Sequence, residues 1–176
     1  ESCFDCTIGT RAQNEGSTMC QPCQAGEYGE SCDKCPVGWY RGGDDDDVSQ
    51  CDECLAGEYQ NAEGAAQCIS CFPGSYQRAA GSSLCVRCPI GWSVKGQNNQ
   101  QCDECPAGKN QPDQSGTTCN ECIPGKYQNL PGQANCLDCA VQSYTNKAGL
   151  ASCIDCTIGK TAASNGSTMC QPCQAG

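Results

Sequence analysis

The sequence predicts a small disulfide-rich fold of β-hairpins and turns, built as an elongated rod of tandem repeats with little or no helix. Three observations predict it. Cys-x-x-Cys pairs recur about every 17 residues, glycine recurs at fixed places between them, and large apolar residues are scarce. Such a regular period indicates an array in which each repeat is supported by its neighbours.

The cysteine pairs define the repeats. Eleven Cys-x-x-Cys pairs account for all 22 cysteines. The spacing changes at one place, where Cys20 to Cys32 is 12 residues and Cys32 to Cys51 is 19. Cysteine at this density is typical of a disulfide scaffold. Because disulfides persist in oxidising compartments, we expect an extracellular or cell-surface protein.

The composition excludes several other classes of protein. Leu, Ile, Val and Phe together number 18 of 176 residues, and the net charge is -10, so cross-links must replace a hydrophobic core. The ten Lys and Arg residues are scattered, which argues against nucleic-acid binding. No apolar run is long enough to span a membrane. The sequence starts at Glu1 without a leader, and we interpret it as a mature segment of a longer chain.

Positions within a repeat are numbered here from its second cysteine. Position +3 is glycine in ten of the eleven repeats, with Gln142 the exception, and position +5 holds all six tyrosines. Position +10 is glycine in six regular repeats and Asn98 in a seventh. In the eighth, the glycine is displaced by one residue, to Gly116. Glycine and asparagine tolerate positive φ, so this pattern predicts a turn, a short strand and a hairpin.

A longer period lies above the 17-residue repeat. Residues 1–26 match residues 151–176 at 19 of 26 positions, an offset of 150 residues. The sequence therefore predicts regular repeats over residues 1–23, which are copied at 151–173, irregular acidic repeats over 24–51, and regular repeats over 52–150. Residues 151–176 are interpreted as the start of the next super-repeat.

Two segments carry a resemblance to a known family. Residues 54–71 read CLAGEYQNAEGAAQCISC, and residues 122–139 read CIPGKYQNLPGQANCLDC. They resemble the ephrin-receptor-like cysteine-rich repeat of extracellular proteins and are more distantly similar to the cysteine-rich repeats of tumour necrosis factor receptors. The resemblance covers nearly the whole chain, and the unequal loops of residues 24–51 depart from it.

The resemblance implies that the second cysteine of each pair bonds to the first cysteine of the next, leaving Cys3 and Cys173 over. A crossed pairing, first to first and second to second, stays open from the sequence alone. The implied disulfides are Cys6–Cys20, Cys23–Cys32, Cys35–Cys51, Cys54–Cys68, Cys71–Cys85, Cys88–Cys102, Cys105–Cys119, Cys122–Cys136, Cys139–Cys153 and Cys156–Cys170.

The residues offer little for catalysis. Histidine is absent, and no carboxylates are spaced as a recognisable catalytic pair, so we expect no enzyme activity and no cofactor. Two Cys-x-x-Cys pairs could hold zinc, but eleven evenly spaced pairs in an acidic chain favour disulfides. A redox dithiol would need a thioredoxin-like α/β pattern, which the sequence lacks.

Two local features suggest ligands or modifications. Asp44, Asp45, Asp46 and Asp47 form an acidic run that is either a solvated loop or a weak calcium site, although it lacks the spacing of an EF-hand loop. Asn165 begins a sequon, Asn-Gly-Ser, at an expected hairpin tip, which makes it a candidate for glycosylation.

These observations predict a structural extracellular protein that self-associates into a fibre, a cell-surface coat or a flagellar-hair-like filament, with glycans as further partners. The alternative is the ectodomain of a receptor or adhesion protein that binds a protein ligand. A third class, a secreted calcium or metal buffer, would require the acidic run to be a binding site.

Overall fold

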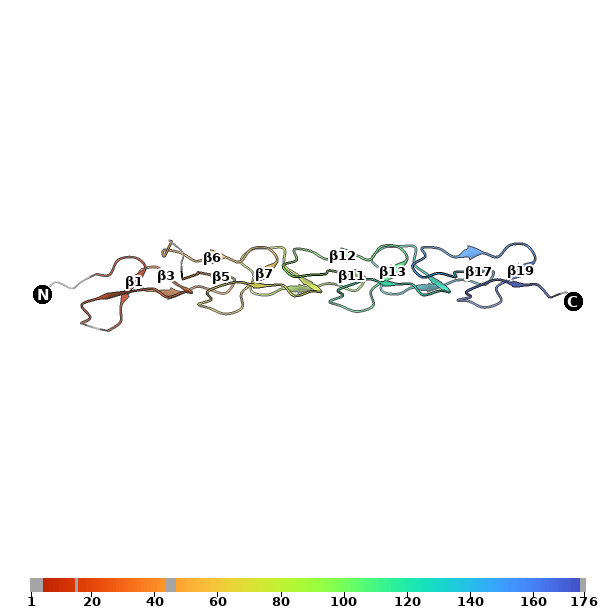
Figure 1. The fold of residues 1–176 in the computed structure, drawn as a ribbon. Helices are drawn as coiled ribbons and strands as arrows, with labels where there is room; N and C mark the ends of the chain where they lie inside the picture. The colour runs from red at the N-terminus through yellow and green to blue at the C-terminus, as the bar shows by residue number, and fades with distance from the viewer. Residues whose placement is uncertain (1–4, 15, 44–46, 175–176) are drawn as a thin grey trace. The chain divides into compact units, whose positions relative to one another are not determined.

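A computed structural model of the chain describes residues 5–14, 16–43 and 47–174, and these residues contain short strands and no helix. Figure 1 shows the strands as short arrows separated by loops. Consecutive strands pair into two-stranded ribbons. The strands are β1 (Thr10–Ala12), β2 (Cys20–Pro22), β3 (Glu27–Tyr28), β4 (Asp33–Lys34), β5 (Trp39–Tyr40), β6 (Asp52–Glu53), β7 (Glu58–Tyr59), β8 (Ile69–Ser70), β9 (Ser75–Tyr76), β10 (Val86–Arg87), β11 (Trp92–Ser93), β12 (Asp103–Glu104), β13 (Lys109–Asn110), β14 (Asn120–Glu121), β15 (Lys126–Tyr127), β16 (Leu137–Asp138), β17 (Ser143–Tyr144), β18 (Ile154–Asp155), β19 (Lys160–Thr161) and β20 (Gln171–Pro172).

The ribbons follow directly from the repeat. The first strand of a typical ribbon occupies positions +4 and +5, and it pairs with the two residues between the next pair of cysteines. In β15 and β16, for example, Lys126 lies opposite Asp138 and Tyr127 lies opposite Leu137 in an antiparallel register. The predicted fold class, hairpins and turns without helix, is therefore confirmed.

The turns need positive φ at two positions. At position +3 the φ is 82° for Gly91 and 69° for Gln142. At position +10 it is 61° for Asn98, as the sequence predicts for a residue replacing glycine. In the repeat with a displaced glycine, the positive φ of 60° belongs to Ser115, so Gly116 does not take over the turn.

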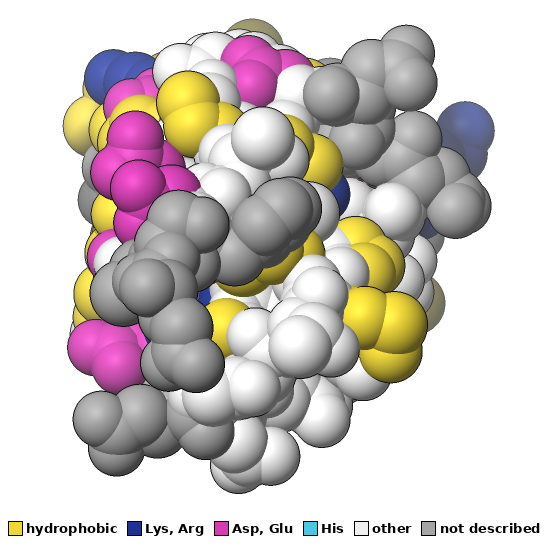
Figure 2. Space-filling model, turned by 90° about the vertical axis from the view of Figure 1, so that its left-hand side faces the viewer, with side chains coloured by type: hydrophobic (Ala, Val, Ile, Leu, Met, Phe, Trp, Pro, Cys, Tyr) yellow, Lys and Arg dark blue, Asp and Glu magenta, His cyan; other side chains and the backbone are white. Residues whose placement is uncertain are grey.

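In the described part of the chain, ten disulfides join the second cysteine of one pair to the first cysteine of the next, which is the pairing that the resemblance implies. Nine close loops with sequence separations of 14 or 16, and Cys23–Cys32 closes one with a separation of 9. The second cysteines supply the core, because seven of them, from Cys35 to Cys139, are at most 1% exposed. Many large apolar side chains remain exposed, and Figure 2 shows hydrophobic groups at separate places on the displayed face.

The chain forms two compact units, each holding five of the ten disulfides. Unit 1 comprises Glu1–Phe72, Tyr76–Val86 and Gln97–Gln101, and unit 2 comprises Pro73–Ser75, Arg87–Gly96 and Cys102–Gly176. Both units are built in the same way, and neighbouring repeats make the same kinds of contact in each.

Backbone hydrogen bonds join each repeat to the next. In unit 2 the Gly108 N–H donates to the Gln128 carbonyl at 2.7 Å, and the Gln128 N–H donates to the Leu150 carbonyl at 3.3 Å. In unit 1 the Gly38 N–H donates to the Gln60 carbonyl in the same way at 2.7 Å. The N–H at position +3 therefore donates to the carbonyl at position +6 of the next repeat. In the same way, the N–H at position +6 of a repeat donates to the carbonyl at position +11 of its own next repeat.

A second contact reaches two repeats along the chain. A Cβ atom at Gly91 would lie 2.0 Å from the carbonyl oxygen of Gly132, which is position +10 of the second following repeat. The same approach occurs at Gly26–Gly64, Gly38–Gly81, Gly57–Asn98, Gly74–Ser115, Gly108–Gly149 and Gly125–Gly166. Glycine at position +3 is thus needed for two reasons: its turn has a positive φ, and another backbone approaches where a Cβ atom would lie.

We predict that Gly91→Ala destabilises unit 2 by roughly 2–4 kcal/mol, because the methyl group strains a positive φ and also collides with the Gly132 carbonyl. Gly96→Ala is the matched control, since its φ is +85° and its Cβ meets nothing within 4 Å among the described residues. It should cost about 1–2 kcal/mol. Thermal denaturation and hydrogen exchange of the Gly132 amide measure the difference, and equal effects of the two substitutions would contradict the two-repeat contact.

We also predict that the ten disulfides will be found by peptide mapping of the unreduced protein. Each linked pair of peptides should contain the second cysteine of one repeat and the first cysteine of the next, because their Cα atoms lie 5.2–5.8 Å apart, within disulfide range. A Cys3–Cys20 linkage would instead support the crossed pairing.

Candidate functional site

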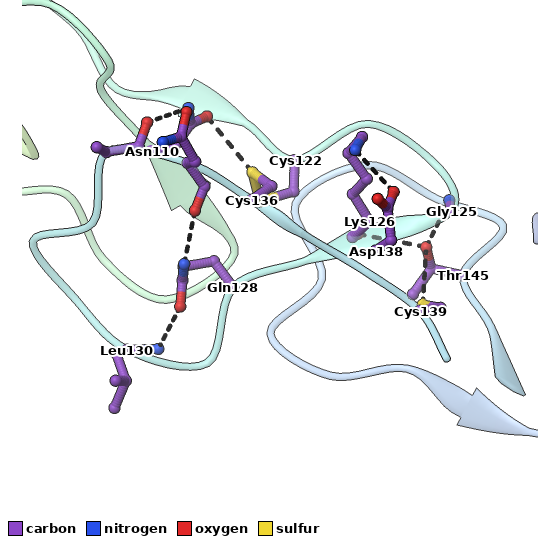
Figure 3. Close-up of a disulfide and its surroundings, with 12 residues drawn as sticks. Asn110, Cys122, Gly125, Lys126, Gln128, Leu130, Cys136, Asp138, Cys139 and Thr145 are labelled. Atoms are coloured by element: carbon purple, nitrogen blue, oxygen red, sulfur yellow. Dashed lines mark hydrogen bonds and ion pairs between the residues drawn. A yellow bond between two sulfur atoms is a disulfide. The ribbon is translucent and has the colours of Figure 1, made fainter. Parts of the chain in front are cut away.

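A glutamine at position +6 braces the interior of four hairpins. Gln60, Gln111 and Gln128 are buried, and Gln77 is half-buried. In Figure 3 the Oε1 atom of Gln128 accepts a hydrogen bond from the Leu130 N–H, at 3.1 Å. The Nε2 atom of Gln128 donates to the Asn135 carbonyl at 2.7 Å. The same two bonds, to the N–H at position +8 and the carbonyl at position +13, are made by Gln60, Gln77 and Gln111. One carboxamide therefore joins both sides of each of these hairpins.

Side chains at position +5 lie against disulfides of the following repeat at two places. The Oδ1 atom of Asn110 is 3.4 Å from the Sγ atom of Cys136, and its Nδ2 atom donates to the Ala134 carbonyl at 2.8 Å. The hydroxyl of Ser93 lies 3.1 Å from the Sγ atom of Cys119. A disulfide sulfur carries no proton, so the Ser93 hydroxyl is the donor there.

An arginine replaces the glutamine in the irregular segment. Arg41 occupies position +6 and is 2% exposed. Its Nη1 atom donates to the carbonyls of Gln24, at 3.1 Å, and Glu27, at 2.7 Å. Its Nε atom donates to the Asp47 carbonyl at 3.4 Å. The planar guanidinium therefore joins the short loop after Cys23 to the long loop after Cys35, which gives the two unequal loops a common anchor.

The acidic run lies in the long loop, and of its four residues Asp47 is among those described, while Asp44, Asp45 and Asp46 are not. The Asp47 carboxylate accepts hydrogen bonds from the Ser49 hydroxyl, at 2.5 Å, and the Ser49 N–H, at 2.9 Å. These two bonds hold the pKa of Asp47 below its ordinary value. The sequence favours a solvated loop here over a calcium site, and both interpretations stay untested. The described residues contain no cluster of three or more metal-ligating side chains.

The predicted glycosylation site is accessible. Asn165 is exposed, and its Oδ1 atom accepts a hydrogen bond from the Val141 N–H at 3.2 Å. The hydroxyl of Ser167, the third sequon residue, donates to the Ser164 carbonyl at 2.6 Å. The attachment of a glycan to Asn165 stays a prediction.

Two further expectations concern the cysteines left over and the membrane. Cys173 is a free, exposed thiol, whereas Cys3 lies outside the described residues. Across residues 5–14, 16–43 and 47–174, no helix is long and apolar enough to cross a membrane.

The turns were predictable from the sequence, whereas the roles of Arg41 and of the glutamine braces were not. A signal for the braces exists, because Gln60, Gln77, Gln111 and Gln128 share position +6. Polar residues at this spacing are ordinary in loops, so the sequence does not distinguish a buried brace from a solvated side chain.

Comparison with known proteins identifies one family. Residues 57–96 match the family model described as tyrosine-protein kinase ephrin type A/B receptor-like. No curated protein matches the chain. The matched segment runs from β7 to β11 and contains the Cys71–Cys85 disulfide. Repeats of this kind form a non-catalytic ectodomain family, and together with the ten disulfides the match indicates an extracellular domain. Residues 57–96 carry the ephrin-receptor-like cysteine-rich repeat that the sequence resemblance predicted.

Proposed function

We propose that this chain is part of a structural extracellular protein, a disulfide-stapled repeat rod that self-associates into a fibre, a surface coat or a flagellar-hair-like filament. The observation that carries the proposal is the contact between position +3 and position +10 of the second following repeat, which recurs in both units. The regular repeats joined by this contact present the same features to their successors, so the array can be extended by adding such repeats without any new type of contact.

Gln142 supports the extension of the array by whole super-repeats. It is the one non-glycine residue at position +3. Its second following repeat begins at Cys173, which corresponds to Cys23 at the offset of 150 residues. The loop after Cys23 reaches its disulfide partner, Cys32, before position +10. A continuing super-repeat would therefore place no +10 carbonyl against the Cβ atom of Gln142, and glycine would not be needed there.

The irregular segment would then recur once per super-repeat. Its short and long loops are held together by the buried Arg41 guanidinium, which bonds to carbonyls in both. We assign to residues 24–51 a bend or a lateral contact that marks each 150 residues of the filament.

A receptor or adhesion ectodomain is the second candidate, because the matched family model is that of ephrin-receptor-like domains. In that case the chain binds a protein ligand and does not associate with other copies of itself. The two candidates differ in whether the isolated protein polymerises, which electron microscopy can determine.

We predict that electron microscopy of the native material will show long fibres. Along the axis of these fibres, one feature should recur per 150-residue super-repeat, because the irregular loops occur once in that length. Discrete monomers would support the ectodomain instead. Fibres without an axial repeat that corresponds to 150 residues would contradict the role proposed for residues 24–51.

We predict that Arg41→Met destabilises the irregular segment by roughly 2–3 kcal/mol, because three carbonyls lose the charged donor that a buried guanidinium supplies. Hydrogen exchange of the Gly26 amide, which donates to the Arg41 carbonyl, reports the local opening. Arg11→Met is the control, since the Arg11–Glu27 ion pair involves an arginine side chain that is 42% exposed, and its loss should cost less than about 1 kcal/mol. An Arg41→Met segment as protected as the wild type would rule out the anchor.

A further inference from the structure

The hairpin of residues 161–171 has no glutamine at position +6 and contains a hollow. The hollow has a volume of about 420 Å³ and is lined by residues 161–169 and 171. Position +6 of this repeat is Ala162, which is 2% exposed. Its methyl group stands where other repeats extend a carboxamide across the hairpin.

The hairpin has the frame of a braced one. In β19 and β20, Lys160 lies opposite Pro172 and Thr161 lies opposite Gln171, which is the register of β15 and β16 shifted by two repeats. The closing disulfides also agree, with Cα–Cα distances of 5.7 Å for Cys156–Cys170 and 5.6 Å for Cys122–Cys136. The backbone groups that Gln128 binds therefore have counterparts beside the hollow.

Those counterparts are the Ser164 N–H at position +8 and the Met169 carbonyl at position +13. In the braced hairpin of Gln128 the same positions belong to Leu130 and Asn135. In the hairpin of Ala162 the Ser167 hydroxyl donates its one proton to the Ser164 carbonyl. This hydroxyl therefore does not donate to the Met169 carbonyl. A donor and an acceptor that elsewhere hold one carboxamide thus border the hollow.

We propose that the hollow of residues 161–171 binds a carboxamide group from outside the repeat, namely the end of a Gln or Asn side chain of a neighbouring protein chain. The incoming NH₂ group donates to the Met169 carbonyl, and the incoming carbonyl oxygen accepts from the Ser164 N–H. The proposal does not depend on filament formation, since it concerns one hairpin of the single chain.

The corresponding hairpin in residues 1–26 differs in the state of its donor N–H. Ala12 also occupies position +6 there. However, the Asn14 N–H at position +8 donates to the Ser17 hydroxyl oxygen at 3.1 Å. That N–H is already bonded within the loop. In the later copy the Ser167 hydroxyl instead donates to the Ser164 carbonyl. The Ala12 hairpin therefore serves as an internal comparison in which binding is weaker.

The test is a titration of the whole 176-residue chain with acetamide, followed by the amide signals in two-dimensional ¹H–¹⁵N NMR. We expect a saturable shift of the Ser164 amide with a dissociation constant of roughly millimolar, as suits a ligand of four heavy atoms. Ala162→Gln supplies the chain's own carboxamide and should weaken acetamide binding at least tenfold.

Gln128→Ala is the reciprocal variant, because it removes a brace from a hairpin with the same frame. It should create a new saturable site, reported by the Leu130 amide. The native disulfides, checked by mass spectrometry, show that each variant has folded. No saturable shift at Ser164 in the wild type, or an equal shift in Ala162→Gln, would overturn the proposal.

Two small ligands define the chemistry of the site. Acetate keeps an acceptor but has no NH₂ donor, so it should bind at least tenfold more weakly than acetamide. N-methylacetamide models the acetamido group of an amino sugar. Tighter binding of N-methylacetamide than of acetamide would overturn the assignment to Gln or Asn side chains and indicate a glycan instead.

Discussion

Every repeat depends on the disulfide that joins its second cysteine to the next pair, because this bond provides the core that apolar side chains do not. The second cysteines of seven repeats are almost completely buried, while residues such as Leu55 and Ile123 remain more than half exposed. Closing a loop of about 15 residues contributes roughly 3 kcal/mol in the chain-entropy model. The hydrogen bonds between repeats then act on loops whose ends are already fixed.

The sequence specified much of this fold because its signals are local. A glycine or asparagine that needs positive φ is recognisable from the residue itself, which is why the turns at Gly91 and Asn98 were predictable. Ser115 was not, because serine rarely adopts that conformation, and the neighbouring Gly116 offered a better local candidate. There the contacts of the hairpin outweighed the preference of a single residue.

The contacts that the sequence did not reveal are distant along the chain. Gly91 and Gly132 are two repeats apart, and their approach depends on how successive hairpins are placed. Arg41 resembles an ordinary loop arginine until the short loop after Cys23 brings two carbonyls to its guanidinium. The contacts of Arg41 and of the glutamine braces were therefore less predictable than the fold. Their partners are backbone groups, which every residue possesses.

The disulfides also determine how the chain would carry tension. A pulling force follows the shortest covalent path, which crosses each disulfide and then runs through the three peptide units of a Cys-x-x-Cys pair. The residues of each loop lie off this path. With a Cα–Cα distance of 5.7 Å across Cys139–Cys153, and about 3.5 Å for each extended residue, one repeat can lengthen to roughly 16 Å without breaking a covalent bond. Unfolding the hairpins would thus release none of the length held in the loops while the disulfides are intact.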